Sequence, residues 1–392
     1  MKRTLGVLFA LALAIPFAVQ ASAASSGQVV INGNGGFLTC GCVSGGDGSP
    51  GNPYVIGPLT INANSAPAVS ISNTTRSFTL LHLNVHVTGA ADGILLTNVS
   101  GPASITQVNV DGPPSGGGGG GIHLVNSSKV AISGDSVNSM QGWGIKVERS
   151  WQTTISFMTV AHNGLSNPGS TESAGVSPNP FLAGITGDAP GGVLLRGGHD
   201  NTLTDSLLNE DAYAGFELVG ETGDMVSKIH VRYPDYFGGV LQSVMNSKLD
   251  GVSLQTADFD GLLMRASNGN TITDSTFSAN GPIGNEWNAK VVPYFIAGAY
   301  VGWGSSTNRF TADNGNFGNT GPDLVIDDGT LLPGAGFVIH GVNQTAQPLN
   351  QPSTYTTLGV SMAAGSGNVA CGNSFAAGYW YPSSLNANSS CP

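Results

Sequence analysis

Apolar residues recur with a period of 23 positions between His199 and Ser267. This stretch divides into three consecutive units, 199–221, 222–244 and 245–267, whose features stay in register. The fifth position holds Leu203, Val226 and Leu249; the tenth holds Leu208, Val231 and Leu254; the seventeenth holds Gly215, Gly238 and Gly261; and the twentieth holds Leu218, Leu241 and Met264. A fixed period of this length predicts a solenoid in which each unit is one coil.

Each unit has the pattern of short strands. Apolar residues at positions 18 and 20 alternate with other residues at positions 19 and 21, as in a half-buried strand. Positions 5 and 10 indicate two further strands, and Asn, Asp, Ser and Gly occupy the turns between them. We therefore predict an all-β fold, a parallel β-helix of about ten coils around a column of aliphatic and Phe side chains. The general rule for parallel crossovers favours a right-handed coil.

The register extends in both directions. The unit 128–150 has Ile132, Val137, Gly144 and Val147 at the same four positions, and Ile272 and Phe277 continue the period after residue 267. We expect the β-helix over residues 54–330, an N-terminal cap over 24–53 and a C-terminal cap over 331–392. Caps are needed because an open strand edge at either end of a solenoid invites aggregation.

Several short motifs resemble a known family. The segments NTITD (270–274), NTLTD (201–205) and GIHLVNS (121–127) are similar to the repeats of the pectin-lyase-like superfamily, and GDGSPGNPYVI (46–56) resembles the opening of its NosD-like branch. The resemblance covers residues 54–330. It implies a right-handed parallel β-helix but no particular activity, because one fold hosts many functions.

The first 23 residues are typical of an export signal. Lys2 and Arg3 precede an apolar stretch, and Ala21-Ser22-Ala23 forms a small-residue cleavage site. No later segment is apolar for long enough to span a membrane. We therefore expect a signal peptide over 1–23 and a secreted or periplasmic mature protein.

Four cysteines in an exported chain indicate disulfides. Cys40 and Cys42 lie near the start, and Cys371 and Cys391 bracket the last segment. Of the three possible connectivities we favour Cys40–Cys42 and Cys371–Cys391. A pair of reduced thiols or a metal site at Cys40 and Cys42 is the alternative.

Charge excludes one class of partner. The chain has a net charge of −11 and only 9% charged residues, whereas a nucleic-acid-binding protein requires a basic footprint. An acidic polysaccharide is still a possible partner, since a local basic patch or a bound cation can override the global charge.

Three expansions interrupt the period at the same place in the coil. They are the glycine run 116–121, an insertion between Ala161 and Pro190, and another between Ala279 and Ala297. Each falls just before the strand that begins at position 18. Insertions into a solenoid collect on one face, which is often the binding face. Because of this placement, we expect the outward side of that strand to carry function.

The outward positions of that strand contain a charged group. Position 19 holds Leu95, His123, Lys146, Leu194, Glu217, Val240 and Leu263, and position 21 holds Thr97, Val125, Glu148, Arg196, Val219, Gln242 and Arg265. Arg196 is suited to clamp a carboxylate, and Lys146 or His123 is suited to abstract a proton beside it. Glu148 and Glu217 form the candidate acid/base pair of a glycosidase. The alternative is that Glu148 and Arg196 simply pair across adjacent strands.

Two further sets of residues complete the candidate site. Trp143, Gln242 and Arg265 are candidates for substrate binding, and Trp303 is a further aromatic candidate. Asp211, Asp235, Asp258 and Asp260 come from three successive coils, where Ca²⁺ would relieve the repulsion between stacked carboxylates. The alternative is that these are solvated turn residues.

We therefore hypothesise an exported protein that binds an acidic extracellular polysaccharide and cleaves it as a lyase or glycosidase. A non-catalytic protein is the alternative, either a NosD-like periplasmic accessory factor or a surface adhesin that binds a cell-surface glycan.

Overall fold

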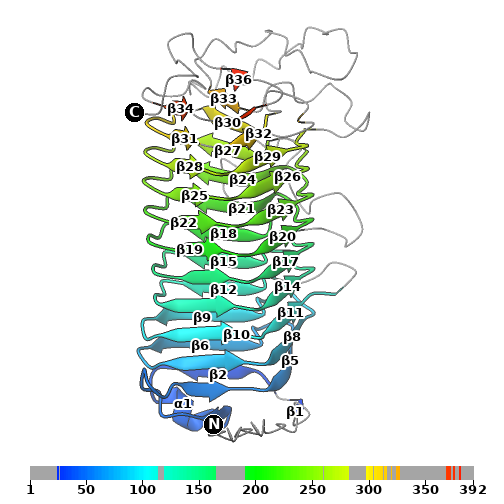
Figure 1. Ribbon diagram of the computed structural model, residues 1–392. Coiled ribbons are helices and arrows are strands. Elements are labelled where there is room, and N and C mark those ends of the chain that lie inside the picture. Colours follow the sequence, from blue (N-terminus) through cyan, green and yellow to red (C-terminus); the bar gives the residue numbers. More distant parts are fainter. Residues whose placement is uncertain are drawn as a thin grey trace, which may run out of the picture.

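A computed structural model describes residues 24–25, 27–113, 119–164, 190–258, 260–281, 297–302, 304–311, 313–315, 319, 324–326, 368–371, 374–375 and 379–380. These residues form stacked coils, with the described N-terminal residues at one end of the stack and the described C-terminal strands at the other (Figure 1). The predicted signal peptide lies outside the described residues. No helix among the residues described is long and apolar enough to cross a membrane.

The coils build three sheets of twelve strands each. Sheet A contains β1 (Ala24–Ser25), β5 (Leu59–Ala63), β8 (Leu83–Val87), β11 (Asn109–Asp111), β14 (Ser136–Asn138), β17 (Thr159–Ala161), β20 (Leu207–Asn209), β23 (His230–Arg232), β26 (Ser253–Gln255), β29 (Thr276–Ser278), β32 (Asn314–Gly315) and β35 (Ser374–Phe375). Sheet B contains β2 (Val29–Asn32), β6 (Val69–Thr74), β9 (Ile94–Val99), β12 (Ile122–Val125), β15 (Ile145–Glu148), β18 (Val193–Arg196), β21 (Ala214–Val219), β24 (Phe237–Gln242), β27 (Leu262–Arg265), β30 (Ala299–Gly302), β33 (Leu324–Ile326) and β36 (Tyr379–Trp380). Sheet C contains β3 (Val43–Gly45), β4 (Tyr54–Ile56), β7 (Phe78–Leu81), β10 (Ala103–Thr106), β13 (Val130–Ser133), β16 (Thr154–Ser156), β19 (Thr202–Thr204), β22 (Met225–Ser227), β25 (Lys248–Asp250), β28 (Thr271–Thr273), β31 (Arg309–Thr311) and β34 (Val369–Cys371).

The predicted register is confirmed. Leu203 pairs in register with Val226, and Val226 with Leu249, so the fifth position of each unit stacks on the next. These side chains are fully buried and belong to one continuous core. All the strand pairs are parallel except β3 with β4. The predicted parallel β-helix is therefore confirmed. Each regular coil contributes one strand to each sheet, so the twelve strands per sheet differ slightly from the number of coils predicted, which was about ten.

The glycine at position 17 is explained by how closely successive coils approach. A Cβ atom built on Gly121 would lie 2.5 Å from the carbonyl oxygen of Gly144 and 2.2 Å from Cγ1 of Val137. The corresponding atom on Gly215 would meet Val231 at 2.4 Å, and the one on Gly238 would meet the carbonyl of Gly261 at 2.5 Å. The residues at position 17 are therefore glycines because the corner before sheet B leaves no room for a side chain.

Polar ladders satisfy the backbone at the corners. Asn201, Asp224, Ser247, Asn270, Asn308 and Asn368 each accept a hydrogen bond from a backbone N–H of the preceding coil, at 2.7–3.0 Å. All six side chains are buried. Because an unpaired buried N–H group is costly, Asn, Asp and Ser at these turns are structural.

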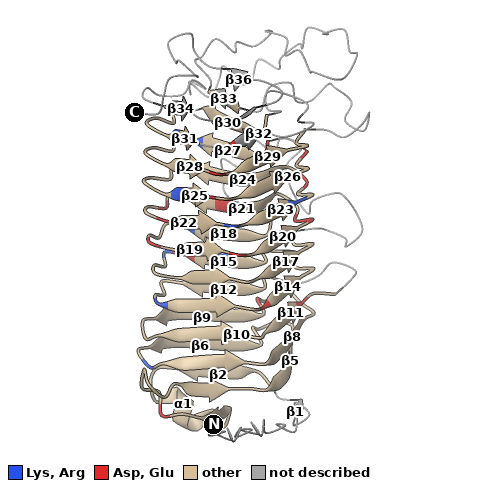
Figure 2. Cartoon of the chain, in the orientation of Figure 1, with Lys and Arg blue, Asp and Glu red and all other residues tan. Residues whose placement is uncertain are grey.

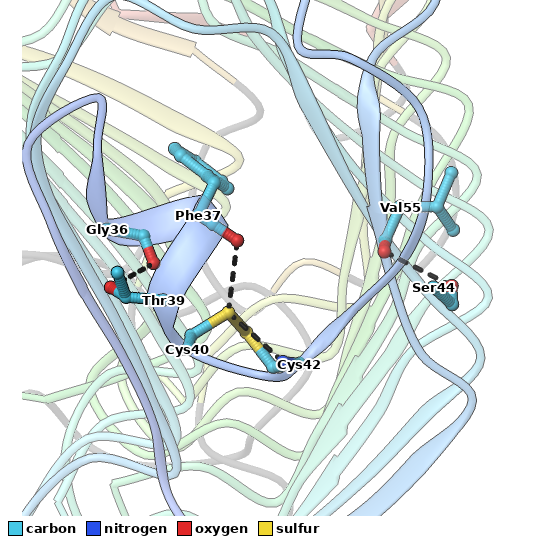
Figure 3. The surroundings of a disulfide bond; sticks show 7 residues. All are labelled: Gly36, Phe37, Thr39, Cys40, Cys42, Ser44 and Val55. Carbon is cyan, nitrogen blue, oxygen red and sulfur yellow. Dashed lines mark hydrogen bonds between the residues drawn. A yellow bond between two sulfur atoms is a disulfide. The ribbon is translucent and has the colours of Figure 1, made fainter.

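At both ends of the stack, the segments that the sequence assigns to caps contain strands of the three sheets. At the N-terminal end, β2 already pairs with β6 in sheet B, and the short helix α1 (Gly36–Thr39) places Phe37 against Tyr54. The predicted Cys40–Cys42 disulfide follows this helix (Figure 3). At the other end, strands β34 to β36 continue all three sheets beyond residue 330. Cys371 lies in β34, but its predicted partner Cys391 is outside the described residues.

We predict that Gly121→Ala destabilises the β-helix by about 1–3 kcal/mol, since the added methyl group overpacks the corner. Chemical denaturation measures the change in the free energy of unfolding. Gly51→Ala is the matched control, because a Cβ atom there meets nothing within 4 Å. Equal losses in the two variants would contradict the close-approach explanation.

Buried carboxyl groups within the corner ladders give the fold a pH dependence. Burial raises the pKa of Asp135 to about 7, of Asp224 to about 8 and of Asp313 to about 7. In the unfolded chain these groups titrate near pH 4. Because the folded pKa exceeds the unfolded one, the stability linked to these groups is complete below about pH 4 and is lost as pH rises through 7 to 8.

We predict that the free energy of unfolding falls between pH 5 and pH 8, and that Asp135→Asn reduces this slope by up to about 1.4 kcal/mol per pH unit. Urea denaturation across this range measures the slope. Asp135→Ser should flatten it equally, because Ser206 and Ser275 accept the equivalent backbone hydrogen bonds in other coils. An unchanged slope in both variants would show that Asp135 is not among the groups responsible.

Candidate functional site

The outward face of sheet B carries the predicted columns in the predicted order. His123 pairs with Lys146, Lys146 with Leu194, and Leu194 with Glu217. In the second column Glu148 pairs with Arg196. The chain has few charged residues, and Figure 2 marks the positions of Lys, Arg, Asp and Glu along the described ribbon.

The outward face divides into two halves. Position 19 is partly exposed as far as β15, where it is occupied successively by Ser70, Leu95, His123 and Lys146. From β18 onward it is buried, in the order Leu194, Glu217, Val240, Leu263 and Tyr300. These five residues are buried although they do not belong to the continuous inner core. We call β6, β9, β12 and β15 the open half of sheet B.

A network of charged side chains lies where the open half ends. The imidazole of His123 is held between two carboxylates, with Nδ1 at 2.9 Å from Oδ2 of Asp92 and Nε2 at 2.9 Å from Oε2 of Glu148. The other oxygen of Glu148 is 3.3 Å from Nζ of Lys146 and 3.7 Å from Nη1 of Arg196. We call these five residues the charged cluster.

The side chains of the charged cluster are accessible, with exposed fractions between 17% and 26%. The predicted pairing of Glu148 with Arg196 across the ladder is present, but it is the longest of the contacts. Glu148 is therefore anchored mainly by His123 and Lys146, and Arg196 lies at the border of the cluster.

Asp92 is the member of the cluster that sequence reasoning missed. It lies one residue before Gly93 of the position-17 column, and its Oδ1 accepts a hydrogen bond from the backbone N–H of Gly120 in the next coil. A Cβ atom on Gly120 would be 2.8 Å from that oxygen, so the glycine leaves room for the carboxylate. The sequence signal that could have identified Asp92 is its place directly before Gly93. In the next coil, the equivalent position before Gly121 is the small residue Gly120, and His123 follows closely.

The contacts of the cluster shift the pKa values of three of its members. Burial opposes the charges of His123, Asp92 and Glu148, but the hydrogen bond and charge of Asp92, with the hydrogen bond of Glu148, outweigh burial and raise the pKa of His123. The same imidazole holds the pKa of Asp92 below its ordinary value, and His123 together with Lys146 does so for Glu148. Lys146 and Arg196 add two cationic side chains beside Glu148.

The remaining predicted site residues are not part of this cluster. Glu217 is fully buried and Arg265 is only 4% exposed. Burial raises the pKa of the Tyr213 hydroxyl above its ordinary value; the charge of Glu217 adds to this rise, and the charge of Arg265 opposes it. Gln242 lies between them in sheet B and is partly exposed.

Trp143, the predicted aromatic platform, is only 5% exposed and presents no open ring face. Trp303 and the insertions at 165–189 and 282–296 lie outside the described residues.

The four predicted calcium ligands occupy corner positions. Oδ1 of Asp211 accepts hydrogen bonds from the backbone and side chain of Asn163, and Oδ1 of Asp260 accepts one from the backbone of Ala297. Burial raises the pKa of Asp211 and Asp260, and burial with the charge of Asp258 raises that of Asp235 to about 8. Within the described part of the chain, no group of three or more metal-ligating side chains lies close enough to hold a metal ion. Calcium binding stays a prediction from the sequence.

Comparison with known proteins gives no family. No family model matches the chain, and no curated protein matches it. Among solved structures, the periplasmic alginate epimerase AlgG is 11% identical, with 68% of this chain and 74% of that one covered and a TM-score of 0.44. The Azotobacter vinelandii mannuronan C-5 epimerase AlgE6 A-module is 13% identical over 84% and 91% of the two chains, with a TM-score of 0.47.

The Dettilon tailspike protein is 12% identical over 83% of this chain and 60% of its own length, with a TM-score of 0.49. All three TM-scores are below 0.5, so we infer neither family nor activity from these similarities. The NosD-like branch likewise stays a prediction from the sequence.

We predict that Asp92→Asn lowers the pKa of His123 by about one unit or more, because the variant loses a carboxylate in direct contact with the ring. An NMR titration of the histidine ring protons measures this pKa. Asp111→Asn is the matched control, since Asp111 contacts His86 at 2.6 Å in another sheet. A His123 pKa that responds to neither substitution would contradict the network.

Proposed function

We propose that the protein binds an acidic polysaccharide, with Lys146 and Arg196 of the charged cluster contacting its carboxylates. The observation that carries this proposal is that two cationic side chains, Lys146 and Arg196, lie together on an outward, partly exposed sheet face, in a chain whose net charge is −11. Positive charge at this place favours an anionic ligand, and the negative charge of the rest of the chain disfavours the ligand elsewhere.

The surface next to the cluster suits a polymer. Strands in a β-helix are stacked about 4.8 Å apart, so equivalent side chains recur along the axis at that spacing. In the open half the two outward columns contain Ser70, Ser72, Leu95 and Thr97, which combine hydroxyl groups with apolar surface. A sugar chain presents the same mixture of hydroxyl groups and C–H surface, and we expect it to lie along these columns.

The protonation of the cluster favours binding over acid-catalysed hydrolysis. A glycosidase needs a general acid whose pKa is raised. The pKa of Glu148 is lowered by its contacts, and the proposed partner Glu217 is fully buried. Both ring nitrogens of His123 face carboxylates, so the ring is a poor proton acceptor. The sequence also proposes Lys146 or His123 as the base of a β-eliminating lyase, and the experiment below tests that activity as well.

We predict that the mature protein binds polymers of galacturonate, mannuronate or glucuronate, and that Lys146→Ala and Arg196→Ala each weaken binding about tenfold or more. The reason is the loss of a charge-assisted hydrogen bond to a carboxylate. Affinity measured by calorimetry should fall as salt rises. Ultraviolet absorbance of the digests, with and without Ca²⁺, reports an unsaturated lyase product, and reducing ends report hydrolysis.

Lys228→Ala is the matched control for this experiment. Lys228 has a 73% exposed side chain and lies 3.8 Å from Asp205, outside the charged cluster. Its removal changes the net charge as much as the removal of Lys146 does, and should leave affinity unchanged. Binding to none of the three polymers, or equal losses in all three variants, would overturn the proposal.

A further inference from the structure

An exposed pair of aromatic rings lies at the corner between sheets B and C. Trp151 and His199 occupy the same position in successive coils and form a β-bridge. Their rings stack with a centroid separation of 6.0 Å and an interplanar angle of 12°. Trp151 is 37% exposed and the His199 side chain is 53% exposed. Neither ring belongs to the core, so core packing does not account for this stack.

One face of the indole is available to a ligand. His199 covers the face directed toward the following coil. In the preceding coil the equivalent position is occupied by Ser128, whose short side chain is buried. A serine is too small to cover an indole, which agrees with the exposure of Trp151. The open indole face thus lies on the side of Ser128, next to the exposed Lys129.

Polar residues lie near the ring pair in the chain and in the preceding coil. Arg149 is exposed in the left-handed conformation at the corner, and its Nε donates a hydrogen bond to Oδ1 of Asn126 in the preceding coil. Nδ1 of His199 is 2.9 Å from Oδ2 of Asp200, which holds the imidazole in place. A flat apolar ring bordered by guanidinium, ammonium and amide groups has the composition of a carbohydrate site, in which an aromatic face packs against sugar C–H groups and polar groups bind its hydroxyls.

The ring pair is continuous with the charged cluster. Trp151 follows Glu148 by three residues, and His199 follows Arg196 by three. Gly197 and Gly198 form this turn in the second coil, and Arg149 and Ser150 form it in the first. The stem of Arg149 lies over Gly197, with Cγ 3.7 Å from the position of a Cβ atom there. The same two coils therefore present a cationic site on sheet B and an aromatic site at its edge.

We propose that Trp151, supported by His199, forms a sugar-stacking subsite that binds a neutral pyranose face of the same polysaccharide. This inference deepens the proposed function, since it assumes that the ligand of the charged cluster is a carbohydrate. The chain of the ligand crosses the corner from Arg196 and Glu148 to Trp151. One sugar unit is recognised by charge and a neighbouring unit by stacking.

The test compares oligouronates with the same oligomers after their carboxyl groups have been reduced to alcohols. Trp151→Ala should weaken binding of both forms about tenfold, with a loss that does not change with salt, because stacking involves no net charge. Lys146→Ala should weaken only the acidic form. Trp151→Phe should restore most of the affinity, and binding to the wild-type protein should change its tryptophan fluorescence.

Phe157→Ala is the matched control, since Phe157 is a 68% exposed aromatic residue at a different corner. An unchanged affinity of Trp151→Ala for both oligomers would overturn the subsite while leaving the proposed function standing. A third outcome is possible: the wild-type protein binds the reduced oligomers, Trp151→Ala weakens this binding, and Lys146→Ala does not change the affinity for the acidic form. That result would support the subsite and overturn the cationic site. A loss in Phe157→Ala equal to that in Trp151→Ala would also overturn the subsite.

Discussion

The close approach of successive coils is the constraint on which the rest of the structure depends. Parallel hydrogen bonding fixes the distance between strands at about 4.8 Å. At the corner before sheet B this distance leaves no space for a Cβ atom between Gly121 and the carbonyl of Gly144. The same spacing lets a side chain in one coil accept a hydrogen bond from the backbone of another, as Asn270 does from Ser247. Glycine and asparagine at fixed positions are thus two results of one geometry.

That geometry also creates the charged cluster. Asp92 reaches Gly120 and His123 in the next coil, and His123 reaches Glu148 in the coil after that. Each contact joins neighbouring coils, so the β-helix places residues that are 25 to 31 positions apart in the chain at hydrogen-bond distance. The cluster is held by the scaffold and needs no flexible loop among its five members.

The sequence predicted the frame well because the frame is periodic. The fifth-position ladder through Leu203, Val226 and Leu249 was visible from spacing alone, and so was the outward column containing Lys146. Periodicity does not report what covers an outward position. Glu217 and Lys146 share a column, yet one is fully buried and the other partly exposed. Residue type alone favours Trp143 as an aromatic platform for a sugar, but its side chain is buried. Trp151, which begins the next unit, is exposed.

The charge balance of the cluster argues for recognition by a positive edge. Asp92 and Glu148 hold His123 between them, and each pKa shift in the trio favours the ionised state. Lys146 and Arg196 are both drawn toward one oxygen of Glu148, Oε1, on neighbouring strands. Both cations reach this outward face, so an incoming carboxylate can share them with Glu148. In an otherwise acidic molecule, this shared site is the place where an anionic sugar meets the least repulsion.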